Sequence, residues 1–377
     1  MEKTVVVLGK TVTALGTLRA LKPLRREGYR IVLATTDTTE NIALHSNIPD
    51  RKVVFSDGLV TGLLDLAAEF SGKPALLFTR DADIVEVSEQ RELLEPHYRF
   101  LLPSHEAVET LMEKGRFARF AADKGLSTPA TIFVHSKAEL LRVPDAIRYP
   151  FIVKPYLLHA ERVDDEAGLH RLVGRLQALH FHSMIAQEYI EGNDDQLFFV
   201  FLLFDQESRL VHSMVGRKLR QWPVSYGTTS LAVTVDNHRL LAEVEQFRQS
   251  GDWKGYCSIE YKYDAPTDRY VIMEPTVGRF NQQIALTVAS GVNFPVAMVR
   301  LLDGEQVSLK PQKNAIRWIY ESNDLFSYFR AGNGYGYLRN FFRPRVQVLF
   351  SASDPAPLWF ELTGLARKKM NKLLQRG

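Results

Sequence analysis

The chain has 377 residues and a mass of 42.9 kDa, with 45% hydrophobic and 24% charged residues. This is ordinary globular composition, which excludes collagen-like, low-complexity and disordered proteins. The formal net charge of +3 is too balanced to predict nucleic acid as a partner. At roughly 100–200 residues per domain, the length predicts two or three compact units.

The single cysteine and the short apolar runs exclude further classes of protein. Cys257 stands alone, so no intramolecular disulfide and no multi-cysteine metal site can form. It lies in an apolar run and is expected in the core. The longest apolar run, 197–204, is far shorter than the roughly 20 residues that span a membrane. The N-terminal MEKTVVVLG reads as a strand and not as a signal peptide, so we expect a cytoplasmic protein.

Basic residues gather toward the C-terminal end. Residues 330–377 hold nine basic and two acidic side chains, a net charge of +7, which leaves −4 for residues 1–329. One interpretation is a solvated basic helix, and the other is contact with an anionic surface, either a membrane or an acidic substrate. The apolar face of 364–377 is thin, which favours the first interpretation.

The first hundred residues alternate strands and helices. The patterns predict strands over 5–9, 30–37, 52–57 and 74–81, and helices over 17–28 and 59–72. Apolar strands separated by helices indicate a parallel sheet that is covered on both faces. We therefore expect a Rossmann-like α/β domain over 1–103.

Beyond residue 104 the pattern becomes mixed and then antiparallel. A helix is expected over 104–125, strands are expected near 131–134, 151–155 and 184–190, and helices are expected from about 136 and over 164–180. Alternating runs then predict antiparallel strands over 196–205, 209–219 and 229–235, a helix over 238–250, and a hairpin of 256–264 with 269–275. Another helix is expected to start near Asn281. Runs of this kind indicate α+β lobes after the first domain.

The hairpin places two glutamates opposite each other. The turn 264–269 is rich in turn-forming residues, and a loop symmetric about residue 267 sets Glu260 against Glu274. Strict alternation would put Tyr270, Ile272 and Glu274 on one face. Opposed like charges destabilise a sheet unless a cation lies between them, and oxygen ligands favour Mg²⁺. The alternative is an exposed hairpin edge whose register is misjudged by one residue.

Cations and a strand exit accompany this pair. Lys154 ends the apolar strand at 151–153, where an ammonium group suits a phosphate, although single lysines are usually solvated. The backbone of Glu188 and Ile190 leaves a strand edge free, and Gln187 and Asp194 add polar side chains there. Two further stretches contribute cations: the loop-forming segment 217–230, and Arg279 just after the glutamates. An ordinary strand exit and a basic surface loop are the alternatives.

Taken in order, these segments resemble the ATP-grasp superfamily, most closely its carboxylate–amine ligases of the D-aspartate-ligase-like kind. The resemblance covers about residues 1–300 and rests on VVVLGKTVTALG, EKGRFARFAADKGLSTPAT, YPFIVKP, IAQEYIEGND, RKLRQWP and IEYKYD with YVIMEPTVGRF and ASGVNFP. It implies an N-terminal parallel α/β domain (1–103), a small lid lobe (104–186), a large lobe (187–300) and a basic C-terminal extension (301–377).

The resemblance also implies the cofactors and the site residues. ATP would bind with Mg²⁺, for which Mn²⁺ is a substitute. Its implied contacts are Lys114 and Lys154 on the phosphates, Gln187, Glu188 and Ile190 around adenine, Asp194 at the ribose, Glu260 and Glu274 on the metal, and Lys218, Arg220 and Arg279 near the γ-phosphate or acyl phosphate. Relatives carry asparagine two positions after the second metal glutamate, where this chain has Thr276. Asn281 is a candidate substitute.

The implied activity joins a carboxylate, expected to be that of an amino acid, to an amine through an acyl phosphate, with both substrates small molecules. Two rival hypotheses remain. The first is a nicotinamide enzyme, because Gly9, Gly16 and Asp37 stand near dinucleotide-binding offsets, although GKTVTALG lacks the G-x-G-x-x-G spacing. The second is a degenerate ATP-grasp module that binds a partner or a membrane through 301–377, which Thr276 and the basic tail favour.

Overall fold

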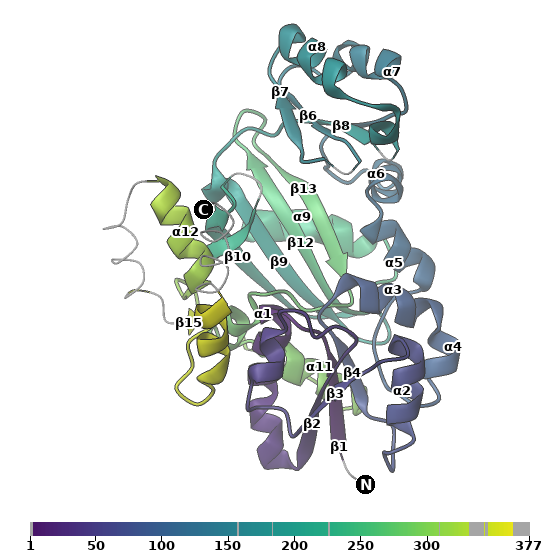
Figure 1. Ribbon diagram of the computed structural model, residues 1–377, viewed down its shortest axis with the longest axis vertical. Coiled ribbons are helices and arrows are strands. Elements are labelled where there is room, and N and C mark those ends of the chain that lie inside the picture. The colour runs from purple at the N-terminus through teal and green to yellow at the C-terminus, as the bar shows by residue number, and fades with distance from the viewer. Residues whose placement is uncertain are drawn as a thin grey trace, which may run out of the picture.

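The first four strands form a parallel sheet. The structure is a computed structural model, and it describes residues 3–156, 158–182, 184–224, 227–308, 310–331, 343 and 346–364. The sheet order is β3-β2-β1-β4, with β1 Lys3–Leu8, β2 Tyr29–Thr35, β3 Arg51–Val54 and β4 Ala75–Phe78. Helices α1 (Val12–Leu21), α2 (Leu59–Ala67), α3 (Asp81–Glu89) and α4 (Arg91–Leu94) surround it (Figure 1).

The helix expected over 17–28 begins earlier and ends earlier than predicted. It starts at Val12, where the Thr11 hydroxyl caps it, and it ends at Leu21. A 3-10 turn over Lys22–Glu27 follows, with Pro23 at its start and Gly28 in the left-handed region at its end. Proline lacks the N–H that would continue an α-helix, so the pattern that looked like one helix is divided there.

The largest sheet has seven strands in the order β13-β12-β9-β10-β11-β14-β15. Its strands are β9 Leu197–Phe204, β10 Leu210–Trp222, β11 Thr228–Thr234, β12 Gly255–Asp264, β13 Arg269–Val277, β14 Arg317–Ile319 and β15 Val346–Gln347. Neighbours pair antiparallel except β14 with β15. Helices α9 (His238–Gln249), α10 (Ile284–Ala289), α11 (Phe294–Leu302) and α12 (Glu321–Ala331) pack around it. Segments from beyond residue 301 thus complete this sheet.

A third, four-stranded antiparallel sheet stands apart at the top of Figure 1. Its order is β5-β8-β6-β7, with β5 Thr131–Val134, β6 Phe151–Lys154, β7 Glu161–Val163 and β8 Met184–Glu188. Helices α7 (Lys137–Leu141) and α8 (Glu166–Arg175) cover it and share a separate hydrophobic core with it. Helices α5 (His105–Met112) and α6 (Lys114–Asp123) connect it to the first domain.

Strand β9 shows why the large sheet holds the molecule together. Its run LFFVFLLF is almost entirely apolar, so both faces of the strand must be buried. Phe199, Phe201 and Leu203 enter one core cluster together with α1, α10 and α11. Val200 and Leu202 enter a second cluster on the other face with α9 and Cys257, which lies in the core as expected.

The predicted fold class is confirmed: a parallel N-terminal sheet is followed by antiparallel lobes. Most of the basic side chains counted over 330–377 lie outside the described residues. Within the described part of the chain, no helix combines the length and the apolar character needed to cross a lipid bilayer.

The double burial of β9 can be tested with two leucines on neighbouring strands. Leu202→Ala removes a fully buried side chain from the second core cluster. We expect it to lower the free energy of unfolding by about 2–5 kcal/mol in urea denaturation, because the cavity is only partly refilled. Leu210→Ala, at the exposed end of β10, should cost less than about 0.5 kcal/mol. Equal losses would contradict this description of the core.

Candidate functional site

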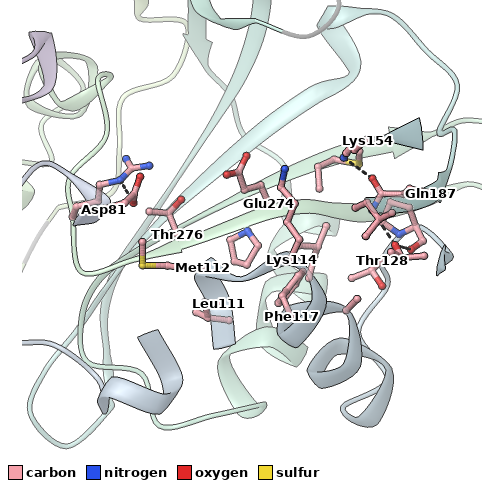
Figure 2. A pocket seen from close by; sticks show the side chains of 18 residues that line it. Asp81, Leu111, Met112, Lys114, Phe117, Thr128, Lys154, Gln187, Glu274 and Thr276 are labelled. Carbon is pink, nitrogen blue, oxygen red and sulfur yellow. Dashed lines mark hydrogen bonds and ion pairs between the residues drawn. The ribbon is translucent and has the colours of Figure 1, made fainter. Parts of the chain in front are cut away.

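A cleft of about 1810 Å³ lies where the small antiparallel sheet, the large sheet and the N-terminal domain meet. Ten of the eleven residues selected from the sequence line it: Lys114, Lys154, Gln187, Glu188, Ile190, Asp194, Lys218, Glu260, Glu274 and Arg279. A smaller cavity of about 300 Å³ shares several of these residues (Figure 2). Residues that are up to 165 positions apart in the sequence therefore meet in one space.

The opposed glutamates occupy one wall of this cleft. Glu260 on β12 and Glu274 on β13 are direct cross-strand partners, so the predicted opposition of the two glutamates is confirmed. The predicted symmetry about residue 267 is wrong, because Asp264 pairs with Arg269 and Tyr261 pairs with Ile272, one residue off that register. Glu260 pairs with Lys218 of β10 at 2.5 Å. Glu274 is reached by solvent through the cleft, yet protein surrounds it closely. That removal from bulk water, followed by the charge of Glu260, raises the pKa of the Glu274 carboxyl above its usual value.

The predicted alternation along β13 is wrong between Ile272 and Glu274. A bulge separates the Glu260–Glu274 pair from the next pair, Tyr261 with Ile272, so Met273 is an extra residue. Ile272 and Tyr270 consequently lie in the second core cluster, whereas Glu274 faces the cleft. A bulge shifts the period of a strand by one residue, and this one turns the carboxylate away from the core.

Two lysines approach the carboxylates from the lid side. Lys114 is the first residue of α6, a helix start that the Glu113 carboxylate caps by accepting from the backbone N–H groups of Gly115 and Arg116. Figure 2 shows Lys114 projecting into the cavity beside Glu274, and Lys154 farther along the cavity next to Gln187. Lys154 donates to Gln187 Oε1 at 2.8 Å, and Gln187 in turn donates to Thr131 at 3.0 Å.

The ammonium group of Lys154 is less basic than a free lysine. Burial is the largest cause, the nearby Lys114 cation is the second, and Glu274 acts in the opposite direction. Together they lower the pKa of Lys154 to about 8. A desolvated cation of this kind gains more from an anionic ligand than an exposed one does, because no hydration shell has to be displaced.

The strand exit at β8 carries its own set of contacts. Glu188 accepts from the backbone N–H of Ala130 at 3.1 Å and from Arg269 at 3.0 Å. Asp194 accepts from Gln221 at 2.8 Å, and Ile190 is buried. These groups line the cleft. The free strand edge expected at Glu188 is not present, because β8 lies between β5 and β6 and the Glu188 N–H donates to the Ala130 carbonyl at 2.8 Å.

Arg279 joins the large sheet to the N-terminal domain. It forms an isolated bridge with Phe78, and Phe280 N–H donates to the Phe78 carbonyl at 3.0 Å. Its guanidinium pairs with Asp81 at the start of α3. The carboxyl end of a parallel strand is where open α/β sheets place ligands, so Arg279 lies at such an edge.

Arg220 differs from the other ten residues, because it does not line the cleft. It makes two hydrogen bonds to the buried Asp324 of α12, at 2.9 and 2.7 Å, and its guanidinium lies 4.1 Å from the centre of the Tyr328 ring. An irregularity in the pairing of β10 between Lys218 and Gln221 turns Arg220 to the opposite side. The sequence interpretation, which placed Arg220 near a transferred phosphate, is therefore not supported by its position.

Sequence reasoning missed several residues that line the cleft. Asp81 and Lys262 are charged, and Tyr189 is aromatic. Tyr189 lies between two cations, with Arg162 of the lid at 4.3 Å and Lys262 of β12 at 5.3 Å from its ring centre. A signal for Asp81 was present, since it ends the fourth predicted strand. Nothing local distinguished Tyr189.

The donor set fits Mg²⁺ bound together with a phosphate ligand. No group of three or more histidine, cysteine, aspartate or glutamate side chains suited to a metal occurs among the described residues. Glu260 and Glu274 provide two carboxylates, and Mg²⁺ is usually held by one or two carboxylates plus waters and substrate phosphates. Thr276 is buried beside the smaller cavity, whereas the Oδ1 atom of Asn281 is buried without a hydrogen-bond partner in the described structure.

The geometry at the first strand does not favour a dinucleotide. A side chain on Gly9 would lie 1.7 Å from the Thr79 hydroxyl, so Thr79 fills the space where a pyrophosphate would approach the backbone. Asp37, the residue suited to a ribose, pairs with Lys10.

Comparison with known proteins identifies the fold. No protein-family model matches the chain. An alignment over 321 residues is 21% identical to the carbamoyl phosphate synthase large chain, C-terminal section, of Methanopyrus kandleri. This alignment covers 79% of this chain and 57% of that protein. The chain thus spans little more than half the length of this curated relative.

Solved structures agree over most of the chain. N5-carboxyaminoimidazole synthetase from Staphylococcus aureus matches with a TM-score of 0.65 and 12% identity over 87% of this chain and 85% of that one. The biotin carboxylase domain of Hydrogenobacter thermophilus 2-oxoglutarate carboxylase, crystallised with MgADP and bicarbonate, matches with a TM-score of 0.64 and 15% identity. That match covers 84% of this chain and 73% of the other. Phosphoribosylglycinamide synthetase from Anaerococcus prevotii matches with a TM-score of 0.63 and 15% identity, over 84% of this chain and 79% of the other.

The chain therefore has the ATP-grasp fold, and this part of the resemblance is confirmed. Identities of 12–15% carry the fold alone. The closer likeness to D-aspartate-ligase-like enzymes stays a prediction.

The electrostatics of the cleft can be tested by titrating Lys154. We expect its ammonium to titrate near pH 8 in NMR spectra of ¹³C-methylated protein. Lys114→Met should raise this pKa, because a neighbouring cation disfavours the protonated form. Glu274→Gln should lower it further, because an anion that favours the protonated form is lost.

Lys137→Met, at the exposed start of α7, serves as the control and should leave the titration unchanged. Shifts of the same sign in the Lys114 and Glu274 variants would contradict the arrangement described.

Proposed function

We propose that the protein is an ATP-dependent ligase that joins a carboxylate to an amine through an acyl phosphate, of the D-aspartate-ligase-like kind. The observation that carries the proposal is the opposed pair Glu260 and Glu274 with Lys114, Lys154 and Lys218 around it in one cleft. An anionic pair enclosed by cations suits a metal-bound polyphosphate better than it suits an uncharged ligand.

The first step is attack of the substrate carboxylate on the γ-phosphate, which yields an acyl phosphate and ADP. Lys114 and Lys154 bind phosphate oxygens from the lid side, while the backbone around Glu188 and Ile190 receives the adenine ring and Asp194 the ribose. Glu260 and Glu274 would hold Mg²⁺, which neutralises charge on the phosphates when it is bound. Positioning and charge stabilisation are the main demands of phosphoryl transfer.

The second step is attack of the amine on the acyl phosphate, with phosphate as the leaving group. A carboxylate and an amine alone form an ion pair, because hydroxide leaves poorly, so the phosphorylation is required. Negative charge develops in both steps, and Lys218 and Arg279 lie on the wall where it can be stabilised. Closure of the lid lobe (about 104–186) over the cleft would exclude water from the acyl phosphate.

A degenerate ATP-grasp module is the second candidate. Thr276 supports it, because a buried threonine is a poorer metal ligand than asparagine. The pairing of Glu260 with Lys218 supports it as well, because the same carboxylate would have to turn to a metal. Release of ADP in the presence of any carboxylate and amine would exclude this candidate. A screen of amino acids against each other and against amino sugars is the direct experiment.

Glu274→Gln tests the assignment of the carboxylate pair. We expect ADP release to fall by roughly 10²–10³-fold, because one of two metal-binding carboxylates becomes a neutral amide. The circular dichroism spectrum and the melting temperature should stay near wild type, because the amide is isosteric and solvent reaches this side chain.

Glu92→Gln, an exposed change on α4, is the matched control and should retain full activity. Wild-type turnover in the Glu274 variant would overturn the site assignment.

A further inference from the structure

The most exposed large apolar side chains of the described residues gather near the C-terminal end. Phe329 is 72% exposed, Trp359 65% and Phe350 54%, and these are the three highest values. Leu362 and Phe326 are exposed as well. We call these five side chains the aromatic patch. All lie within 326–362, about a tenth of the chain, whereas scattered single exposed residues are the normal case.

Four of the five side chains stand on two helical segments that touch each other, and Phe350 lies on the stretch between β15 and the second of these helices. Phe326 and Phe329 are three residues apart on α12, and Trp359 and Leu362 are three apart on the helix over 356–364, so each pair shares a helix face. Ser322 of α12 donates to Glu361 at 3.1 Å, which places the two helices side by side. In Figure 1, α12 and the yellow segment after β15 lie along the same flank, away from α2 and α4.

Buried polar contacts hold the 346–364 segment firmly. The fully buried Asp354 accepts from Arg19 at 2.9 Å, from Ser46 at 2.9 Å and from the backbone N–H of Asn47 at 2.8 Å. On the same segment, Phe360 stacks on His45 with 4.0 Å between ring centres. Trp359 and Leu362 are therefore exposed on a segment that the N-terminal domain fixes in place.

Helix α12 is fixed in a similar way. Its Asp324 takes the two hydrogen bonds of Arg220, and its Glu321 accepts the backbone N–H groups of Val348, Leu349 and Phe350. Phe329 and Phe350 are therefore exposed on segments that buried contacts hold in place. Exposed aromatic side chains on segments that buried ion pairs hold in place are typical of an interaction surface.

The charges nearby decide what that surface meets. Of the four acidic residues between 316 and 364, Glu321, Asp324 and Asp354 are buried and paired, and Glu361 accepts from Ser322. The sequence from 330 to 377 carries a net charge of +7. We propose that the aromatic patch rests on an anionic membrane surface, with aromatic side chains at the headgroup level and the cations of this region attracted to acidic lipids.

A second copy of the chain fits this surface less well. A second copy would carry the same net sequence charge of +7 over its residues 330–377, and like charges oppose the association of two such segments. An anionic lipid surface attracts the same charge, at about 1 kcal/mol for each lysine or arginine near it. The proposal is independent of the ligase activity, because none of the five patch residues lines the cleft.

Vesicle co-sedimentation of the full chain tests the proposal. We expect binding to vesicles in which about a third of the lipid is phosphatidylserine, little binding to phosphatidylcholine alone, and loss of binding at about 0.5 M salt. The double variant Phe329→Ser, Trp359→Ser should bind at least about tenfold more weakly, because each buried aromatic ring contributes roughly that factor or more. Its ADP release should equal wild type.

The matched control is Val54→Ser with Leu93→Ser, two exposed apolar residues on the N-terminal domain, which should bind vesicles as wild type does. Brominated lipids should quench part of the tryptophan emission, and Trp359→Phe should abolish that part. Absence of vesicle binding, or equal binding by the double variant, overturns the proposal. A dimer seen by light scattering in the wild type and in the control variant, but lost in the double variant, also overturns the proposal, because the patch would then contact a second copy.

Discussion

The cross-strand register of Glu260 and Glu274 is the constraint on which the candidate site depends. Two like charges placed directly opposite each other weaken a sheet, so the pair persists only where other contacts outweigh that cost. Here β12 is held on its other side by β9, and Lys218 of β10 reaches across to Glu260. Because β9 is buried on both faces, the register of the hairpin is fixed by the centre of the sheet, and the bulge at Met273 turns Glu274 toward the cleft.

The charged groups of the cleft have partners within the protein. Lys154 donates to Gln187, Lys218 pairs with Glu260, and Arg279 pairs with Asp81. A partly desolvated charge without a partner costs several kcal/mol, so these contacts stabilise the cleft. Under the proposed function, a metal-bound polyphosphate would replace these contacts: the cations would contact phosphate oxygens, and Glu260 would contact the metal. The pKa of Lys154 is lowered chiefly because burial removes water from its ammonium, so an anionic ligand would compensate that charge.

Local patterns carried much of the fold and most of the site. Strand runs, their separation by helices and the turn at 264–269 are properties of short segments, so the parallel domain and the hairpin could be predicted. The opposition of Glu260 and Glu274 depends in addition on the bulge at Met273, which offsets the error in the assumed centre of the turn. Arg220 could not, because its partner Asp324 lies 104 residues later and an irregularity in β10 turns it away from its neighbours. The predicted strand face of Tyr270 and Ile272 was wrong for a related reason, because the amino-acid composition carries no signal for a bulge. Asp81 and Tyr189 join the cleft through contacts between domains that no single segment encodes.

Arg220 also connects the cleft to the distant flank. On β10, Lys218 and Gln221 face the cleft, whereas Arg220 between them holds α12, the helix that carries Phe329. A displacement of this strand on ligand binding would therefore reach α12 through one bidentate contact to a buried carboxylate. Two sites influence each other only when each ligand distinguishes the same two states, so a shared strand alone gives no coupling. Strand β10 does carry Lys218 of the pair Lys218–Glu260, and it contacts the aromatic patch through the ring of Trp222 on Phe326. If both the proposed function and the proposed membrane contact hold, a shift of β10 is the change that would link them.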